Sequence, residues 1–327
     1  MKAICVDEKS EGFPLRWEDV PDPVCGAGEV LVDIHATAVN RADLMQRQGN
    51  YPPPSGMPPY MGLEMSGVIA ELGEGVTNWQ VGDRVCALLS GGGYAERVAV
   101  PQELLIRIPN DWDFVKAAAV PEVFYTAFVN LFIEAGLQEG ETVLIHGGGS
   151  GVGTAGIQMA REAGCRVLVT AGTEEKLDRC KELGAEFGVN YKERDFAEAI
   201  LEAYPDGVDV ILDIAGSDYL ARNIELLKLR GRLVIIALLT GATAEINLSF
   251  LMRKRLRVIG SVLRSRSLEE KAAIAQQFEQ RFWPLLVNGT IEPVIFEVVP
   301  ITQAEAAQDI LAQNRNTGKV IMAVRDE

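Results

Sequence analysis

Residues that can ligate a metal ion or perform acid–base catalysis are scarce in this chain. Its 327 residues include two histidines, His35 and His146, and five cysteines, none of them spaced as a Cys-x-x-Cys pair. A catalytic zinc needs about three converging protein ligands, and a nucleophilic serine or cysteine usually needs a histidine beside it. Both histidines fall in predicted strands, where we interpret them as structural. The sequence therefore predicts no metal site and no Ser–His–acid or Cys–His machinery.

Positive charge and long apolar runs are also in short supply. The chain carries 31 Lys and Arg against 46 Asp and Glu, a formal net charge of −15. Nucleic acid and anionic membranes would repel such a protein, and we expect the basic run at 253–257 to be a solvated turn. The apolar stretch 123–133 is too short to cross a bilayer, and no signal segment opens the sequence. These features predict a cytoplasmic protein without nucleic-acid or membrane partners.

Glycine, in contrast, is concentrated at one informative point. Residues 142–154 read TVLIHGGGSGVGT, an apolar strand that runs into a glycine turn and then into a helix. A helix over 150–163 and a strand over 166–170 complete a strand–helix–strand unit of about 30 residues. Glycine lets the backbone turn sharply, and the first N–H groups of the following helix attract a diphosphate. This segment predicts a dinucleotide-binding turn.

The order of the predicted elements divides the chain into two domains. Before about residue 113 the sequence reads as short strands separated by glycine turns and by a proline-rich loop at 51–60. Apolar strands then alternate with amphipathic helices, which is typical of an α/β fold with a doubly wound parallel sheet. The last segment reads as strands again, and we expect it to return to the first domain. The predicted division is a β-rich substrate domain, residues 1–121 and 290–327, and a Rossmann-like dinucleotide-binding domain, residues 122–289.

The second strand of the predicted dinucleotide-binding domain indicates which nicotinamide cofactor binds. In such folds an acidic residue at the tip of this strand holds the ribose hydroxyls, but this strand ends LVTAGT at 168–173 without an acid. Glu174 and Glu175 follow in the first turn of the next helix, where acids suit the helix dipole. Lys176 comes next and could meet a 2′-phosphate, although a solvated helix lysine is the alternative. The pattern favours NADPH over NADH.

Without a metal or a catalytic histidine, the chemistry that remains is hydride delivery by the reduced nicotinamide to an acceptor that needs little acid assistance. Quinones and activated alkenes are such acceptors. Alcohols and simple carbonyl compounds usually need a Lewis acid. The composition therefore favours a reductase of quinones or of activated double bonds.

Over essentially its full length the chain resembles the medium-chain dehydrogenase/reductase superfamily, and specifically its zinc-independent quinone oxidoreductases. The resemblance is carried by residues 40–49 with Tyr51, 62–64, 118–122 with Thr126, 146–156, 190–191 and 261–266. Within that group it is most similar to the subgroup that includes the quinone oxidoreductase induced by the tumour-suppressor protein in animals. Zinc-dependent relatives carry a histidine in place of Leu63 and a cysteine near Asn40. The resemblance implies a GroES-like fold for the β-rich domain.

The resemblance also implies three sets of cofactor-binding residues. The diphosphate would be held by backbone N–H groups of Ser150, Gly151 and Val152. The 2′-phosphate would lie among Gly172, Lys176 and Tyr191. The nicotinamide end would be lined by Thr126, Leu238, Gly241, Leu263, Arg264 and Asn316.

On the substrate side the resemblance implies Asn40 and Tyr51. An amide or a phenol could donate a hydrogen bond to a quinone oxygen as charge develops there, which would contribute about 1–3 kcal/mol. Each residue has a structural alternative. Tyr51 could stack on the neighbouring prolines, and Asn40 could cap a helix over 41–46.

Together these features predict an NADPH-dependent quinone reductase that works in the cleft between the two domains. One alternative is a reductase of activated carbon–carbon double bonds in enals, enones or enoyl thioesters. Another is an NADPH-binding protein with little turnover. The resemblance further implies a homodimer, in which the apolar segment 256–263 forms an edge strand that pairs with its mate.

Overall fold

The computed structural model describes residues 1–325 and divides the chain into two compact units. Unit 1 comprises Met1–Tyr125 and the chain from Leu263 onward, and unit 2 comprises Thr126–Val262. Unit 2 therefore ends at 262, whereas the sequence analysis placed this boundary at 289. The helices between these positions, α9 (Leu268–Arg281) and α10 (Trp283–Val287), belong to unit 1 because buried Phe278 of α9 packs on Phe124 and Tyr125.

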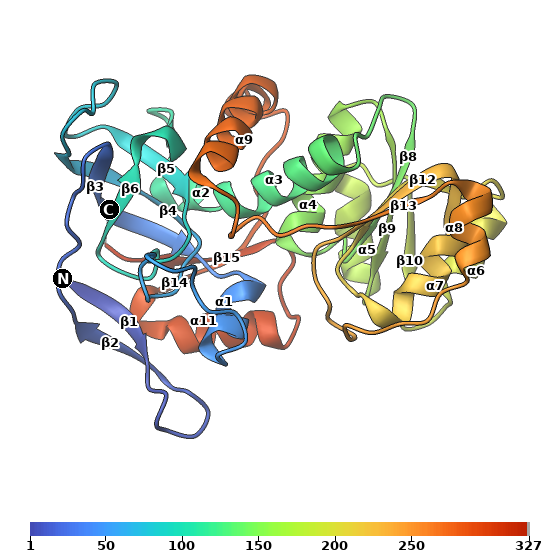
Figure 1. The fold of residues 1–327 in the computed structure, drawn as a ribbon, viewed down its shortest axis with the longest axis horizontal. Helices are drawn as coiled ribbons and strands as arrows, with labels where there is room; N and C mark the ends of the chain where they lie inside the picture. Colours follow the sequence, from blue (N-terminus) through green and yellow to red (C-terminus); the bar gives the residue numbers. More distant parts are fainter. Residues whose placement is uncertain (326–327) are drawn as a thin grey trace. The chain divides into compact units, whose positions relative to one another are not determined.

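Unit 2 is built on a six-stranded sheet in the order β10-β9-β8-β11-β12-β13, in which every pairing is parallel (Figure 1). The strands are β8 (Thr142–His146), β9 (Arg166–Ala171), β10 (Phe187–Asn190), β11 (Val208–Asp213), β12 (Leu227–Ile235) and β13 (Arg257–Gly260). The strand order reverses between β8 and β11, which is the point where ligands bind in doubly wound sheets. The predicted doubly wound parallel sheet is confirmed.

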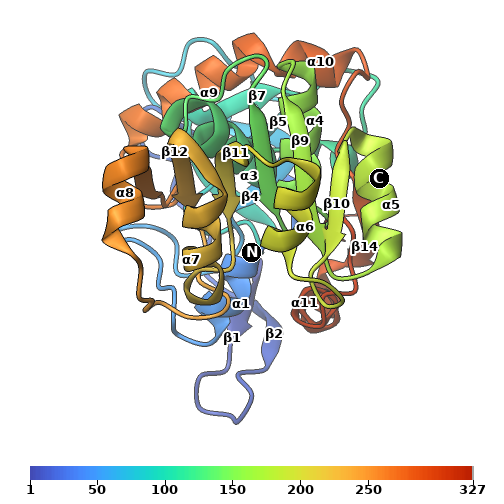
Figure 2. The same cartoon turned by 90° about the vertical axis from the view of Figure 1, so that its right-hand side faces the viewer.

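Helices cover this sheet, with α4 packed beside α5 and α6 beside α7 (Figure 2). The helices of unit 2 are α4 (Gly151–Glu162), α5 (Glu174–Leu183), α6 (Phe196–Ala203), α7 (Ser217–Leu226) and α8 (Leu248–Lys254). Their ends follow from the sequence. The Thr173 side chain accepts the Lys176 N–H at the start of α5, and Gly184 ends that helix in the left-handed conformation at φ 116°.

Unit 1 contains a mixed sheet in the order β14-β15-β3-β4-β5-β7, with β6 paired to β3, and a separate β1-β2 hairpin. These strands are β1 (Lys2–Val6), β2 (Leu15–Asp19), β3 (Glu29–Ala38), β4 (Glu64–Leu72), β5 (Arg84–Leu88), β6 (Arg97–Pro101), β7 (Leu105–Arg107), β14 (Ile295–Pro300) and β15 (Lys319–Ala323). Because β15 pairs antiparallel with β3, the last segment of the chain joins the sheet of the first. The proline-rich loop at 51–60 contains no helix or strand.

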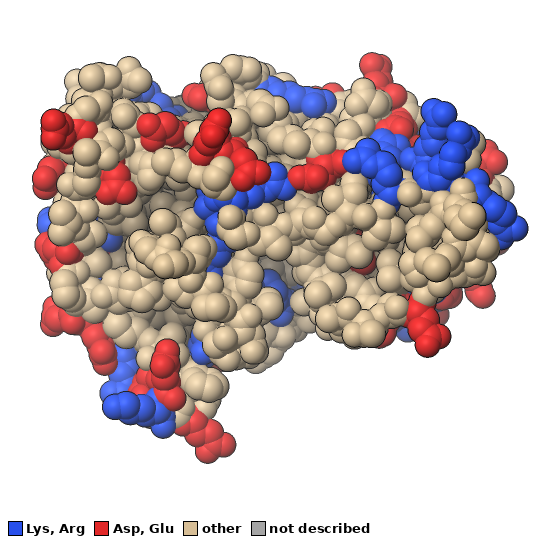
Figure 3. All heavy atoms as spheres, viewed as in Figure 1, with Lys and Arg blue, Asp and Glu red and all other residues tan. Residues whose placement is uncertain are grey.

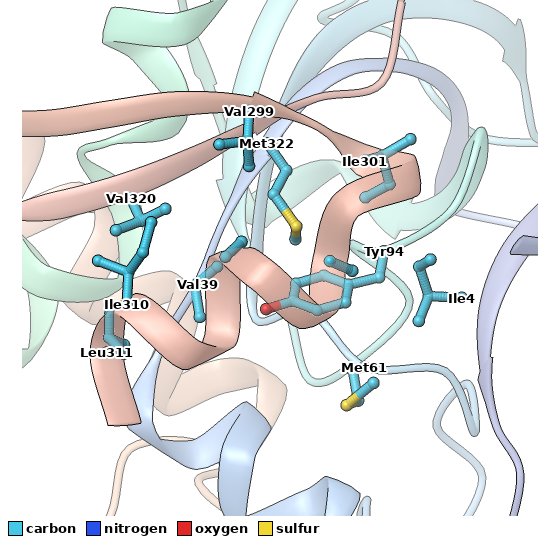
Figure 4. Packing of buried hydrophobic residues seen from close by; sticks show 12 residues of the cluster. Ile4, Val39, Met61, Tyr94, Val299, Ile301, Ile310, Leu311, Val320 and Met322 are labelled. Carbon is cyan, nitrogen blue, oxygen red and sulfur yellow. The ribbon is translucent and has the colours of Figure 1, made fainter. Parts of the chain in front are cut away.

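The helices of unit 1 are α1 (Arg41–Arg47), α2 (Phe114–Ala118), α9, α10 and α11 (Ala304–Ala312), with short 3-10 turns η1 (Gln102–Leu104) and η3 (Ile301–Gln303). Helix α11 closes one part of the core, where Ile310 and Leu311 pack with Val320, Met322 and Tyr94 (Figure 4). Burying such side chains contributes about 1.5–3 kcal/mol each relative to exposure.

The chain passes from unit 1 to unit 2 within α3 (Pro121–Phe128), which continues into the π-helix η2 (Val129–Glu134). The helical stretch Phe114–Glu134 is long and apolar enough for a membrane span by length and composition, but 78% of that window is buried within the protein. Such burial is typical of a core helix. On the face drawn in Figure 3, lysine and arginine side chains gather at the right-hand end, in the area that α8 occupies in Figure 1. Arg253, Arg255 and Arg257 of the basic run are exposed, as predicted, but only Arg255 lies in a turn, because Arg253 belongs to α8 and Arg257 to β13.

Candidate functional site

The glycine turn after β8 packs so tightly that it excludes side chains. Gly147 has a φ of 70°, and the Gly148 N–H donates to the Thr170 carbonyl at 2.9 Å. A Cβ on Gly153 would lie 2.3 Å from the Gly147 carbonyl oxygen and 2.6 Å from that of Gly148. Backbone oxygens cannot yield to such a contact as a flexible side chain could. The first turn of α4 therefore rests directly on the loop, which requires glycine at 153.

Two backbone donors at the start of α4 remain open. Gly151 and Val152 are its first residues, and within residues 1–325 their N–H groups have no acceptor. Ser150 differs from the predicted role, because its N–H already donates to the Gly147 carbonyl at 2.9 Å. Its hydroxyl instead caps the helix by accepting the Gly153 N–H at 3.0 Å. The arrangement presents two N–H groups and the positive end of a helix dipole to an anion.

Beside this turn, the end of β9 offers a second polar surface without an acid at its tip. A Cβ on Gly172 would lie 2.8 Å from the Tyr191 hydroxyl oxygen and 3.1 Å from Cε of Lys192. A Cβ on Gly149 would lie 3.0 Å from Cδ of Lys176, so this lysine lies across the glycine turn. The structure thus brings Tyr191 against Gly172 and lays Lys176 against Gly149 of the glycine turn. It adds Lys192, which the sequence analysis missed although it directly follows Tyr191.

Glu174, the first acid after β9, is held by a neighbouring amide. Glu174 accepts from Nδ2 of Asn190 at 3.5 Å, and the same amide donates to Glu193 at 2.8 Å. The Thr173 hydroxyl oxygen is used as the cap of α5, at 3.3 Å from the Lys176 N–H. Beside the end of β9 lie the Tyr191 hydroxyl and Lys192, and Lys176 lies against the neighbouring glycine turn. Such groups suit a phosphate better than a ribose diol.

The third loop on this edge follows β11 and is held by a buried carboxylate. Asp213 accepts the N–H groups of Ala215 at 2.8 Å and Gly216 at 3.2 Å, and burial raises the pKa of its carboxyl. Ile214 of this loop abuts the glycine turn, because its Cδ1 would lie 2.4 Å from a Cβ on Gly147. The carboxyl ends of β8 and β11 therefore form one continuous surface.

Leu238 and Gly241 lie beside this third loop, as part of the same edge. Gly241 forms a parallel bridge with Gly216, and its carbonyl accepts the Ser217 N–H at 3.1 Å. Leu238 is 53% exposed.

Thr126 is the first residue of unit 2. Its carbonyl accepts a hydrogen bond from Nδ2 of Asn130 at 2.7 Å.

His146 is a structural residue, as the sequence analysis interpreted it. The ring is buried, with Nδ1 at 3.0 Å from the Thr170 hydroxyl and Nε2 at 2.8 Å from Oδ1 of Asn223. Burial lowers the pKa of the His146 imidazole to about 4. The ring is therefore neutral at pH 7 and ties β8 to β9 and α7.

In unit 1, Asn40 belongs to a buried ion-pair network. Its Nδ2 donates to Glu64 at 2.8 Å and its Oδ1 accepts from Nζ of Lys319 at 2.6 Å. Lys319 also pairs with Glu64 at 2.7 Å, and both charged side chains are almost fully buried. The Asn40 N–H donates to Asp43 at 2.8 Å at the start of α1. The side-chain amide predicted to meet the substrate therefore bonds to Glu64 and Lys319, and the backbone N–H of Asn40 bonds to Asp43.

Tyr51 differs from Asn40 in its hydrogen bonds. The Tyr51 hydroxyl has no hydrogen-bond partner in the part of the chain described. Its ring faces the Arg264 guanidinium, with 5.1 Å between Cζ and the ring centroid. Burial raises the pKa of the Tyr51 phenol, and the positive charge of Arg264 opposes that effect. Of the two predicted substrate-side residues, Tyr51 is the one with a donor to offer.

Arg264 lies on this side as well, although the resemblance placed it at the nicotinamide. Its guanidinium donates to the carbonyls of Ser90 at 2.8 Å and Tyr51 at 3.2 Å, and to Oε1 of Gln46 at 2.8 Å. Asn316 donates through Nδ2 to the Gly318 carbonyl at 2.7 Å, which stabilises the turn before β15.

The remaining positions concern the core and metal ligands. Leu263 is buried. Leu63, which stands where zinc-dependent relatives carry a histidine, is also buried. Among residues 1–325, no group of three or more His, Cys, Asp or Glu side chains is placed to hold a metal ion.

Comparison with known proteins identifies the family to which this architecture belongs. Residues 26–110 match the family model described as the alcohol dehydrogenase GroES-like domain, and residues 151–279 match the one described as zinc-binding dehydrogenase. The quinone oxidoreductase of Mus musculus is 34% identical over 328 residues, with 98% of this chain and 97% of the relative covered. The chain belongs to the medium-chain dehydrogenase/reductase superfamily.

Solved structures of this superfamily share the whole fold. A mycobacterial protein solved as a complex with NADPH is 28% identical and has a TM-score of 0.87, with 99% of this chain and 100% of that chain covered. The enoyl reductase CurK is 27% identical and has a TM-score of 0.86, with 98% of each chain covered. The superfamily assignment confirms the predicted pairing of a GroES-like domain with a cofactor domain, and it makes this chain an oxidoreductase.

Proposed function

We propose that this oxidoreductase transfers hydride from NADPH to quinones without a metal ion. The observation that carries the proposal is the carboxyl edge of the unit 2 sheet. There the open N–H groups of Gly151 and Val152 lie beside a strand end that presents Lys176, Lys192 and the Tyr191 hydroxyl. The curated relative from Mus musculus is named a quinone oxidoreductase, which supports the choice of acceptor.

The residues of unit 2 fit a dinucleotide with a 2′-phosphate. Gly151 and Val152 would donate to the diphosphate, and the bare Cα of Gly172 leaves space between Tyr191 and Lys192 that a Cβ would fill. Lysines at a strand tip without an acid favour NADPH, because a carboxylate there would repel the extra phosphate. The NADPH complex of the mycobacterial neighbour supports this cofactor. When bound, the reduced nicotinamide supplies the hydride.

On the substrate side, Tyr51 is proposed as the donor. Hydride addition to a quinone leaves a hydroquinone monoanion, and one proton completes the hydroquinone, so that quinone, NADPH and a proton give hydroquinone and NADP⁺. A phenol that hydrogen-bonds the developing oxyanion stabilises that charge. Tyr51 fits because its hydroxyl is uncommitted among residues 1–325. The proposal assigns Asn40 no contact with the substrate.

The second candidate is reduction of activated carbon–carbon double bonds. The likeness to the enoyl reductase CurK favours it, and the same hydride donor serves both reactions. An alkene needs a proton delivered to carbon after hydride addition, and Tyr51 is again the candidate donor. A Tyr51→Phe variant that loses alkene turnover while retaining most quinone turnover would assign the phenol to that proton.

The direct test is turnover with purified protein treated with a chelator. NADPH should be consumed with a small quinone, more slowly with NADH, and more slowly with an enone than with the quinone. Faster reduction of the enone would favour the second candidate. Tight NADPH binding without turnover of either acceptor would leave a cofactor-binding protein and would contradict the proposal.

We also propose a cytoplasmic homodimer that forms through the outer edge of unit 2. The edge strand β13 and helix α8 expose apolar side chains, with Val258 at 43%, Leu248 at 63% and Met252 at 78%. An exposed apolar edge strand invites pairing. Sedimentation at micromolar concentration should give a dimer, and Val258→Lys should give a monomer. A wild-type monomer would contradict the dimer.

A further inference from the structure

Two buried cations of unit 1 lie side by side without a carboxylate partner. Arg264 and Lys271 are each 6% exposed, and within residues 1–325 all their hydrogen bonds go to neutral oxygens. The buried Lys319 of the same unit, by contrast, forms an ion pair with Glu64. A buried charge without a counter-ion is costly to the fold. Such a pair therefore indicates a place where negative charge is accommodated.

Ser90 joins the two cations into one structure. Its carbonyl accepts from Nε of Arg264 at 2.8 Å, and its hydroxyl accepts from Nζ of Lys271 at 2.7 Å. Lys271 also donates to the carbonyl of Arg264 at 2.7 Å. Neither side chain can move far without breaking these bonds.

Arg264 of this pair contacts Tyr51. The Arg264 guanidinium stacks on the Tyr51 ring and donates to the Tyr51 carbonyl, which fixes the start of the proline-rich loop. It also holds Gln46 through Oε1. A cation against an aromatic face draws electron density from the ring, so the Tyr51 hydroxyl becomes a stronger hydrogen-bond donor.

Three acids lie within electrostatic range of these two cations. Asp43 and Glu122 act electrostatically on Arg264, and Glu122 and Glu270 act on Lys271. Within residues 1–325, neither Arg264 nor Lys271 forms an ion pair with a carboxylate. Burial lowers the pKa of Lys271, and the neighbouring Arg264 acts in the same direction. The effect of Arg264 is the one expected where two positive charges lie close together.

We infer that Arg264 and Lys271 form a positively charged platform that favours an aromatic oxyanion hydrogen-bonded to Tyr51. The inference rests on the proposed function, in which the hydroquinone monoanion is that oxyanion. Its proton comes finally from solvent, and the platform lowers the energy of the anion until the proton arrives. Both cations act through Tyr51 and are positioning residues. Arg264 is thereby assigned to the substrate and not to the nicotinamide.

The platform can be tested by binding, without NADPH and without turnover. The probe is 4-nitrophenol, whose neutral and ionised forms have distinct absorbance spectra. Wild-type protein should bind the phenolate more tightly than the phenol, so the apparent pKa of the probe falls on binding. Lys271→Met should reduce this preference about tenfold, or about 1.4 kcal/mol, whereas Lys271→Arg should restore it. Lys181→Met, which removes an exposed lysine of α5, should change nothing.

Two results would overturn the inference. One is a wild-type protein that shows no preference for the phenolate, a measurement that does not depend on any variant folding. The other is a Lys271→Met protein with a cooperative thermal transition that retains the full preference. A preference for the phenolate without quinone turnover would contradict the proposed function but support the platform. Quinone turnover without a preference for the phenolate would contradict the platform but support the proposed function.

Discussion

The sharpest prediction concerns Gly153, where the first turn of α4 contacts the glycine turn that precedes it. In a Gly153→Ala variant the new Cβ would lie 2.3 Å from the Gly147 carbonyl oxygen and 2.6 Å from that of Gly148. To reach ordinary contact, the loop and the helix start must separate by about 1 Å, and overpacking of this kind costs about 1–3 kcal/mol. The N–H groups of Gly151 and Val152 move with that helix start.

The expected effect on the cofactor follows from those donors. A hydrogen bond to a charged group contributes about 1.5–3 kcal/mol net, so misplacing one of them by about 1 Å should raise the Kd for NADPH about 30-fold. Calorimetric titration with NADPH measures this change, and thermal unfolding measures the accompanying loss of stability.

Gly156→Ala is the matched control, because it lies one turn further along the same helix. Its Cβ would meet only side-chain ends, Cδ1 of Ile145 at 3.1 Å and Cδ1 of Leu131 at 3.4 Å. Both variants gain about 0.5–1 kcal/mol of helix propensity, so their difference isolates the backbone clash. If Gly153→Ala folds and binds NADPH within threefold of the wild type, the account of the glycine turn is wrong.

Three further predictions follow from the polar contacts. Lys192→Gln should raise the Kd for NADPH about five- to tenfold and leave the Kd for NADH unchanged. Lys181→Gln is the control, and equal weakening of both cofactors would show that Lys192 does not contact the 2′-phosphate. His146 has a folded-state pKa of about 4, below its unfolded value, so its contribution to stability is present above pH 6.5 and is lost as pH falls toward 4. Thermal unfolding at pH 7 and 4.5 should show a loss of about 2 kcal/mol in the wild type that is absent in His146→Gln. Parallel behaviour of the two proteins would contradict this. The effect of Asp43 on stability has the opposite pH dependence, because burial raises the folded-state pKa of its carboxyl to about 6. Its contribution to stability is full below about pH 3.8 and is lost as pH rises through 6. Asp43→Asn should therefore remove about 1–3 kcal/mol of the pH dependence of unfolding, and an unchanged pH profile would contradict this.

Much of unit 2 could be predicted from the sequence because its signals are local. The glycine turn at 147–153 follows an apolar strand directly, and alternation of apolar strands with helices specifies a doubly wound sheet. The missing acid at the end of β9 can likewise be read from adjacent residues. Lys192 was missed because its proximity to Gly172 depends on the pairing of β10 with β9 and on the turn after Asn190, which joins residues distant in sequence.

The boundary of unit 2 and the hydrogen-bond partners of Arg264 and Asn40 could not be predicted. The apolar face of α9 would look the same whichever sheet it covered, so its periodicity does not show that Phe278 packs on Phe124. The sequence cannot show which groups a guanidinium meets, and Arg264 bonds to residues more than 170 positions away. The hydrogen bonds of Asn40 to Glu64 and Lys319 likewise join residues that are far apart in the sequence.

The central claim is that this chain reduces quinones with NADPH and needs no metal to do so. Stopped-flow mixing of chelator-treated protein, NADPH and a small quinone measures it directly, through the absorbance of the reduced nicotinamide. The account predicts one NADPH consumed for each hydroquinone formed, at a rate that added zinc does not change. No consumption of NADPH, or turnover that disappears with the chelator and returns with zinc, would contradict it.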